Sequence, residues 1–280
     1  MRLLTAEIQS NCDIAFHGDV HQDNIASSES GLEETFDWIM RERHRRFVFV
    51  GDAIEAITTD DKRYQNDTTN CSIPLKQARA LVKRYEPIRR RGLAWLSGNH
   101  EFMLHRFGDL GEQMARDLAI PYGGTACKIL LRDKHGPIAK VYACHPSRWT
   151  VRSQAKDYEQ RRANMMAAVK RFLVEKAGDC IVMAVGHTHK LIVVPPSPKL
   201  VLYDDGSKLR QAYLQGDNSL PQYIDPDRRW YVNTGSYLRT QILGHDGYAE
   251  RFGYDPVELG YAVLEIRDRK VVAVRCSIVD

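Results

Sequence analysis

The sequence predicts an α/β sandwich, in which helices cover the outer faces of central β-sheets. In the first 120 residues, short apolar runs such as FVFV at 47–50 and LAWL at 93–96 alternate with helical patterns, which is typical of parallel strands covered on both faces. The last 100 residues are mostly strand-like. Clusters of His, Asp and Asn follow the predicted strands directly, at the ends where open α/β sheets bind ligands.

Composition places the chain among globular proteins with a large core. It has 280 residues, of which 43% are hydrophobic and 27% charged. No apolar run approaches the ~18–20 residues of a membrane helix, and no signal-peptide pattern opens the sequence. The six cysteines are scattered without a CxxC pair, which argues against a disulfide framework or a cysteine zinc site. We expect a cytoplasmic protein with reduced cysteines and no membrane association.

We expect one domain over residues 1–280, because the sequence shows no repeat and no Ser/Gly/Pro linker. Two insertions interrupt it, a polar and basic one at about 56–92 and a loop at about 204–228. In the first half, strands are expected at 14–16, 47–50 and 93–96. Helices are expected at 32–45, 74–88 and 102–118, and the polar stretch 58–72 lacks periodicity and is expected to be a loop.

The second half is expected to contain one long helix among many strands. Strands at 128–132 and 139–144 are joined by a turn at 134–137, and the helical pattern covers 155–177. Further strands are expected at 181–185, 191–194, 199–203, 230–233, 261–266 and 271–278. Residues 206–227 are expected to form a loop.

Five polar clusters stand immediately after apolar runs and hold side chains that can bind metals. Alone, each is weak evidence, because a single buried histidine is usually structural and Gly-Asp is a common turn. Five in order, each at a strand end, are hard to explain separately. In chain order they are Asp19-Val20-His21, Gly51-Asp52, Gly98-Asn99-His100-Glu101, His145 and Gly186-His187-Thr188-His189.

In order and residue type these clusters resemble the signature of the calcineurin-like metallophosphoesterases, which is DxH, GDxx(D/E), GNH(D/E), a single His and GHxH. The resemblance covers about residues 14–235; Glu55 supplies the final acid of the second element, and Asn233, Gly235 and Ser236 resemble the closing N-x-G-S. The 47 residues from Asp52 to Asn99 resemble the spacing in phage- and prophage-type members. The resemblance implies a four-layer α/β/β/α sandwich with ligands on loops at the carboxyl ends of strands.

The resemblance also implies a phosphoesterase with two divalent cations, in which a metal-activated hydroxide attacks phosphorus. Asp52 would bridge the two ions. The other ligands would divide into Asp19, His21 and His189 for one ion and Asn99, His145 and His187 for the other. Mixed nitrogen and oxygen ligands suit Mn, Fe, Zn, Ni or Co and do not identify the metal. We expect Mn²⁺, with Fe, Zn, Ni or Co as alternatives.

By the same resemblance, His100 would face the substrate and protonate or stabilise the departing oxygen. Glu101 would orient His100, or it would simply be an acid at a helix N-terminus.

Three positions have alternative interpretations. Proline follows His145 where the family has glycine, so His105 and His135 are alternatives for that ligand. Glu55 would hydrogen-bond a ligand histidine or be solvated. His17 would be structural or would support a ligand.

Two basic segments bear on the substrate. Residues 76–91 hold seven basic residues and one acid, and residues 148–171 hold seven basic residues and two acids. Each is either a solvated helix face or a surface for an anionic substrate. We expect a phosphodiester of a nucleotide or nucleic acid; the alternatives are a phosphomonoesterase acting on a small molecule or phosphoprotein, and a non-catalytic scaffold. The arginines of the protein phosphatase motifs GDxVDRG and RGNHE are missing here, which counts against a protein phosphatase.

Overall fold

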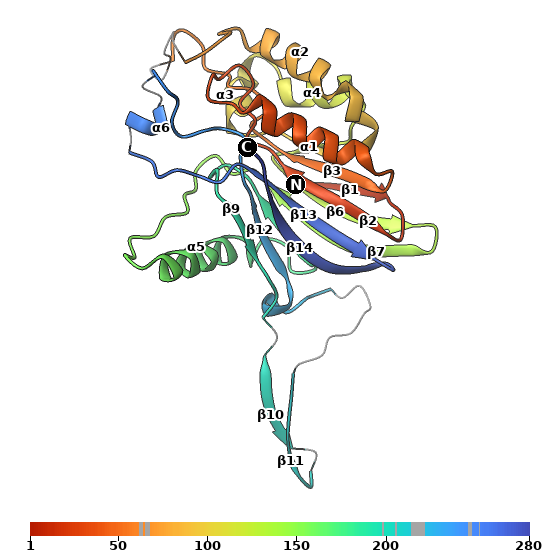
Figure 1. Ribbon diagram of the computed structural model, residues 1–280. Coiled ribbons are helices and arrows are strands. Elements are labelled where there is room, and N and C mark those ends of the chain that lie inside the picture. The colour runs from red at the N-terminus through yellow and green to blue at the C-terminus, as the bar shows by residue number, and fades with distance from the viewer. Residues whose placement is uncertain are drawn as a thin grey trace.

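In the residues that it describes, the computed structural model contains two six-stranded sheets that pack face to face (Figure 1). The described residues are 1–61, 64, 68–197, 199–204, 206–213, 222–245, 248–251 and 253–280. None of the helices in these ranges is long and apolar enough to cross a membrane.

The first sheet, here the β2 sheet, carries three of the predicted polar clusters. Its strand order is β14-β13-β2-β3-β4-β5. Strands β2, β3, β4 and β5 run parallel, so their carboxyl ends meet at one edge, whereas β13 and β14 are antiparallel to their neighbours. The bounds are β2 Cys12–His17, β3 Arg45–Val50, β4 Gly92–Leu96, β5 Tyr122–Gly124, β13 Gly260–Arg267 and β14 Lys270–Ile278.

The second sheet, here the β7 sheet, carries the other two clusters. Its order is β1-β6-β7-β8-β12-β9, and β7, β8 and β12 are parallel to one another. The sequence predicts five of these strands but not β1, an edge strand that is largely exposed and so lacks an apolar run. The bounds are β1 Arg2–Glu7, β6 Ala126–Asp133, β7 Gly136–Cys144, β8 Val182–Val185, β9 Leu191–Val194 and β12 Trp230–Thr234.

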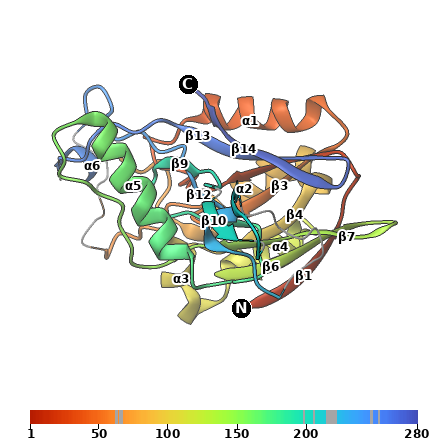
Figure 2. The same cartoon turned by 90° about the horizontal axis from the view of Figure 1, so that it is seen from below.

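Alternating side chains of each strand divide the core into three apolar layers. In β3, Phe47 and Phe49 face helices α1 (Glu29–Arg41), α2 (Pro74–Tyr85) and α4 (Leu110–Asp117), while Val48 and Val50 face the β7 sheet. The far side of the β7 sheet packs against α5 (Tyr158–Leu173). Figures 1 and 2 show α1 and α5 on opposite sides of the strands. The predicted four-layer α/β/β/α sandwich is confirmed.

The helix predicted over 102–118 is wrong as a single element. It is divided into α3 (Asn99–Met103), a 3₁₀ turn (His105–Phe107) and α4. Gly108 separates them with φ of +132°, and the Asp109 side chain accepts a hydrogen bond from the Glu112 amide to begin α4. The first of these short helices begins at the polar cluster, so Asn99 and His100 are fixed by its first turn.

The first two predicted helices also end early. Helix α1 begins after Ser28, whose hydroxyl accepts from the Gly31 amide at 3.2 Å, and it ends at Arg41 because β3 starts at Arg45. Helix α2 ends at Tyr85, and Pro87 lies in the 3₁₀ helix Glu86–Arg91 that follows.

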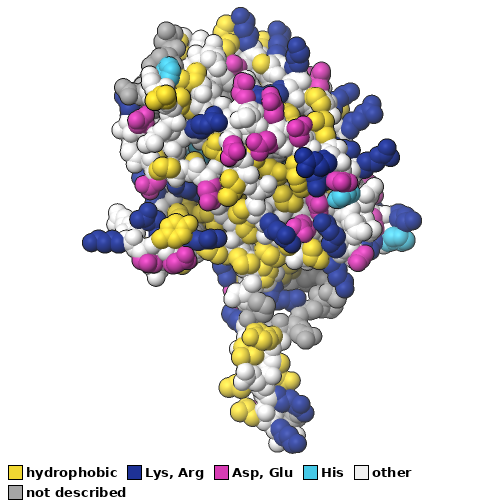
Figure 3. Space-filling view, in the orientation of Figure 1, with side chains coloured by type: hydrophobic (Ala, Val, Ile, Leu, Met, Phe, Trp, Pro, Cys, Tyr) yellow, Lys and Arg dark blue, Asp and Glu magenta, His cyan; other side chains and the backbone are white. Residues whose placement is uncertain are grey.

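A two-stranded arm, β10 (Leu200–Asp204) and β11 (Leu209–Tyr213), projects from the body. The prediction of a loop over 206–227 is therefore wrong for β11, and residues 214–221 of that range lie outside the described residues. Leu200 pairs with Tyr213 in the antiparallel register, and Leu202 (66%) and Leu209 (74%) are exposed. Figure 3 shows apolar side chains along this arm.

His17 ends β2 inside the aromatic core below the helices. Its ring stacks on Tyr85 and meets Phe47, Phe49 and Tyr237 edge-on, so its role is structural. Its Nε2 has no hydrogen-bond partner among the described residues. Burial lowers the pKa of His17 from 6.5 to about 3.

We expect His17→Leu to flatten the acid side of the stability profile. The unfolded chain binds a proton at His17 below about pH 6.5, but the folded chain binds it only below about pH 3, so folding loses stability as the pH falls through this window. The variant should reduce the slope of unfolding free energy against pH by up to about 1.4 kcal/mol per pH unit. Urea unfolding between pH 3 and pH 7 in the presence of chelator measures this slope. Substitution of the exposed His135 by Leu serves as the control. Equal slopes in wild type and His17→Leu would contradict the prediction.

Candidate metal centre

The loops after five strands bring the seven predicted ligand residues to one place. The carboxyl ends of β2, β3 and β4 meet those of β7 and β8 at the same edge of the sandwich. Within each of three groups, the potential ligand atoms lie within 4.8 Å of one another. The groups are Asp19 with His21 and His189, His21 with Asp52 and His100, and Asp52 with His145 and His187.

Most of these residues adopt a strained backbone. Five of the seven have left-handed φ values of +49° to +86°, namely Asp19, His21, Asp52, His187 and His189. Such a conformation costs a non-glycine residue about 1 kcal/mol or more, so the surroundings must hold it. Here the β2 and β3 loops hold each other: the Asp19 amide donates to the Gly51 carbonyl at 2.8 Å, and the His21 amide donates to the Asp52 carbonyl at 3.2 Å.

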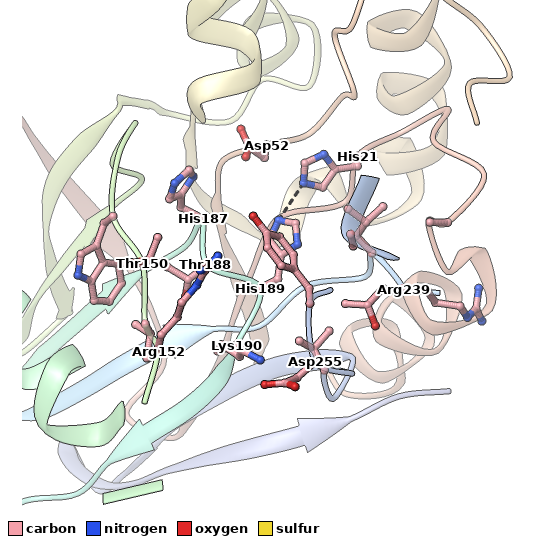
Figure 4. Close-up of a pocket in the computed structure, with 18 of the residues that line it drawn as sticks. His21, Asp52, Thr150, Arg152, His187, Thr188, His189, Lys190, Arg239 and Asp255 are labelled. Atoms are coloured by element: carbon pink, nitrogen blue, oxygen red, sulfur yellow. Dashed lines mark hydrogen bonds between the residues drawn. The ribbon is translucent and has the colours of Figure 1, made fainter. Parts of the chain in front are cut away.

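The first ligand group lies between the two sheets. The Nε2 atoms of His21 and His189 are 3.2 Å apart, drawn as a dashed line in Figure 4, and His189 Nε2 is 3.2 Å from Asp19 Oδ1. His21 Nδ1 lies 3.0 Å from Glu55 Oε2. By donating there, Nδ1 leaves Nε2 unprotonated and pointed at the group. Of the two roles predicted for Glu55, the structure shows the hydrogen bond to a histidine, His21, whose role as a ligand stays a prediction.

The second ligand group is built in the same way around His145. Its Nδ1 donates to the Val50 carbonyl at 2.6 Å, which turns Nε2 toward Asp52 Oδ2 at 3.1 Å and Asn99 Oδ1 at 3.2 Å. The same Asn99 oxygen is 2.6 Å from His187 Nδ1. His145 therefore takes the predicted place despite Pro146, whereas His105 and His135 join none of the groups found among the described residues.

These donors fit a divalent transition metal. Atoms that share one ion at bond lengths of about 2.1 Å and near right angles lie about 3 Å apart, and the contacts above are 2.6–3.2 Å. Imidazole nitrogens with carboxylate and carboxamide oxygens suit Mn, Fe, Zn, Ni or Co. The fit rests on the donor types and on their spacing.

The charges at the site favour a cation. Burial would raise the pKa of Asp52, but His145 and His100 hold it well below its usual range, so the carboxylate is ionised. Burial alone would lower the pKa of His145, yet the carboxylates of Asp52 and Asp19 raise it to about 10. Burial and His145 lower the pKa of His187 to about 4. The buried carboxylates of Asp19 and Asp52 therefore attract positive charge, either as protons on the histidines or as a cation.

The structure corrects the predicted pairing of His100 with Glu101. The His100 Nδ1 donates to the main-chain oxygen of Glu55, while its ring lies edge-on to His21 at 4.6 Å between centroids. The Glu101 carboxylate instead accepts from the amides of Ala53 at 2.6 Å, Ile54 at 3.1 Å and Gly98 at 2.7 Å. Glu101 thus ties the β3 loop to the start of α3, which fits the alternative of an acid at a helix N-terminus.

The chain after β12 braces the centre from behind. Ser236 Oγ donates to the Asp19 carbonyl at 3.0 Å, and the Tyr237 amide donates to the same oxygen at 3.1 Å. Asn233 Nδ2 donates to Thr188 Oγ1, between the two ligand histidines. The N-x-G-S resemblance marks this segment, but the sequence does not indicate that Ser236 supports the left-handed Asp19.

The centre forms one end of a cavity of about 590 Å³. Arg152 and Arg161 of the second basic segment line it, together with Lys190. Among the described residues, none from the first basic segment does, and Arg84 of that segment pairs instead with Glu29 and Glu33 of α1.

Gly98 is required for the close approach of the β4 loop to Asp52. A Cβ at Gly98 would overlap both the Asp52 amide nitrogen and its Oδ1. We expect Gly98→Ala to displace the carboxylate and weaken metal binding at least about tenfold. Calorimetric titration with Mn²⁺ measures it. Gly178→Ala is the control, because its Cβ would meet only the exposed Tyr223 ring and one Arg229 nitrogen; wild-type affinity in Gly98→Ala would contradict the packing described here.

No family model and no curated protein matches this chain. Among solved structures, Vps29 of Entamoeba histolytica complexed with zinc is 12% identical, with a TM-score of 0.32, over 96% of this chain and 98% of that one. The calcineurin-like phosphoesterase YfkN of Bacillus subtilis is also 12% identical, with a TM-score of 0.41, over 96% of this chain and 90% of that one. Similarity at these values carries no inference about the activity of this chain.

Proposed function

We propose that this protein is a metal-dependent phosphoesterase of the calcineurin-like metallophosphoesterase superfamily. The observation that carries the proposal is the place of Asp52, which shares one donor group with His21 and His100 and another with His145 and His187. Asp52 is ionised and buried, as a carboxylate bridging two cations must be. The residues for one ion are Asp19, His21 and His189, and those for the other are Asn99, His145 and His187.

Two bound divalent cations would supply Lewis acidity that activates water and neutralises phosphate oxygens. The chain supplies orientation and a proton. Glu55 and the Val50 carbonyl fix His21 and His145 with Nε2 toward the centre. His100, held at Nδ1 by the Glu55 carbonyl, lines the cavity and can hold a proton at Nε2. Hydrolysis would form a bond from water oxygen to phosphorus and break the bond to the leaving oxygen, which takes the proton of His100; the proton lost by the attacking water passes to solvent, from which His100 is protonated again.

The proposed substrate is a phosphodiester of a nucleotide or nucleic acid. The support is the cavity itself, whose volume falls within the ~300–1,000 Å³ of small-ligand sites and whose walls include Arg152, Arg161 and Lys190. We expect manganese-loaded protein to hydrolyse bis-p-nitrophenyl phosphate and to lose this activity with chelator. Activity on p-nitrophenyl phosphate alone would make the protein a phosphomonoesterase, and no activity on either ester with metal bound would favour a scaffold.

Asp52→Asn tests the shared carboxylate with an isosteric, neutral side chain. We expect it to lower metal content and to reduce kcat for the diester by about 10²-fold or more, because a charge at the heart of the centre is lost. Metal analysis after gel filtration and steady-state kinetics measure both. The control is Asp13→Asn, another buried carboxylate, which pairs with Arg267 outside the centre and should change stability alone. Full metal content with full activity in Asp52→Asn would overturn the proposal.

His100→Ala tests the proton donor. We expect kcat for a thymidine dinucleotide to fall about 10²–10⁴-fold, while the metal content stays at the wild-type level. The loss should be much smaller with bis-p-nitrophenyl phosphate, since p-nitrophenolate departs without a proton. His105→Ala, in the 3₁₀ turn after α3, is the control. Equal losses on both substrates would remove the acid role, and loss of metal would make His100 a ligand.

A further inference from the structure

The cavity extends past the metal centre into a region lined by three cations. Lys190 directly follows the ligand His189, Arg152 lies in the segment between β7 and α5, and Arg161 is in the first turns of α5. In Figure 4, Arg152 and Lys190 lie on the side of the cavity away from Asp52. Arg152 and Arg161 therefore bring part of the positive charge of the second basic segment to the cavity that contains the centre.

The three cations line the same cavity, and the carboxylate of Asp255 lines it with them. Asp255 attracts the Lys190 ammonium, whereas Arg152 and Arg161 repel it. Among the described residues, none forms an ion pair with any of the three cations. Arg161 is held in place by its Nε, which donates to the Ala155 carbonyl at 3.2 Å. Three cations outnumber the one carboxylate of Asp255, so they repel one another, and an anionic ligand would relieve that repulsion.

Aromatic and apolar side chains line the walls beside these cations. The Arg152 guanidinium lies 5.2 Å from the centre of the Tyr254 ring, and Trp149 stacks on Phe172 at 4.1 Å. Tyr254, Trp149, Ile242 and Val257 all line the cavity. Cations that alternate with aromatic faces are the chemistry that binds the phosphates and bases of single-stranded nucleic acid.

We infer that Arg152, Arg161 and Lys190 form a subsite for a second phosphate of the substrate, so that the preferred substrate is a single-stranded oligonucleotide whose scissile diester has a neighbouring phosphate. This inference rests on the proposed phosphodiesterase function. A cavity of about 590 Å³ admits one or two nucleotides of a single strand, and the base beside the second phosphate would lie against Tyr254. The second phosphate is either terminal or an internal diester.

The kinetic test compares the thymidine dinucleotide dTpdT with pdTpdT, which has a terminal phosphate in addition. With manganese-loaded wild type, the added phosphate should lower KM at least about tenfold. Arg152→Gln, Arg161→Gln and Lys190→Gln should each reduce this advantage several-fold. Arg162→Gln, the next residue on α5, is exposed and does not line the cavity, so it should keep the full advantage. The same advantage in all four variants would overturn the subsite.

A binding measurement separates the subsite from catalysis. The probe is a fluorescein-labelled dT4 whose bridging oxygens are replaced by methylene groups, which cannot be hydrolysed. Its affinity for manganese-loaded protein should fall with salt, and each substitution should reduce the slope of log K against log salt by about 0.7. An unchanged slope in Lys190→Gln and Arg152→Gln would exclude an internal diester from the subsite, and an unchanged advantage of pdTpdT in the same variants would then overturn the subsite altogether.

Different results would refute the proposed function and the proposed subsite. If wild type hydrolyses no diester, the proposed function fails, whereas hydrolysis with no effect of the added phosphate or of the substitutions refutes the subsite alone. If the substitutions affect pdTpdT but not the dT4 probe without a terminal phosphate, the subsite takes a terminal phosphate; an effect on both assigns it an internal diester. Metal content of each variant is measured, because Lys190 adjoins His189.

Discussion

The buried carboxylate of Asp52 is the constraint around which the rest of the centre is arranged. An ionised carboxylate that is 1% exposed needs partners that replace water. The His100 amide donates to it at 2.9 Å, and His145 Nε2 lies 3.1 Å away. Gly98 has no side chain where Asp52 stands, so the start of α3 comes close enough to supply that amide. Both sheets therefore contribute to neutralising one charge.

Other groups contact the potential metal ligands without being ligands themselves. Glu55, the Val50 carbonyl and Ser236 each fix one residue of the centre, and Glu101 joins the loops after β3 and β4. Because five donors have left-handed backbones, these contacts also hold a conformation that the loops would otherwise leave. Rigidity at the site thus comes from side-chain hydrogen bonds, most of them to main-chain groups, that join loops far apart in the sequence.

The strands that carry the donors could be predicted because each is an apolar run that ends at a polar cluster, as FVFV does before Gly51. The division of the helical pattern over 102–118 was missed because the apolar spacing continues across Gly108 and Asp109, whose positive φ and side-chain cap separate the 3₁₀ turn from α4. The partner of Glu101 was missed because it consists of backbone amides, which every residue has. Strand β11 was missed because LRQAY lacks apolar alternation and is ordered by pairing with β10.

The arm of β10 and β11 leaves and re-enters the body at a single point. The Ser197 amide donates to the Asp227 carbonyl at 2.7 Å, and Lys199 pairs with the Asp227 carboxylate, so both chain directions are joined at the base. Between them, the described residues 199–204, 206–213 and 222–226 form no strand of either large sheet. This appendage can therefore be lengthened, shortened or exchanged as a module without changing the residues of the candidate metal centre.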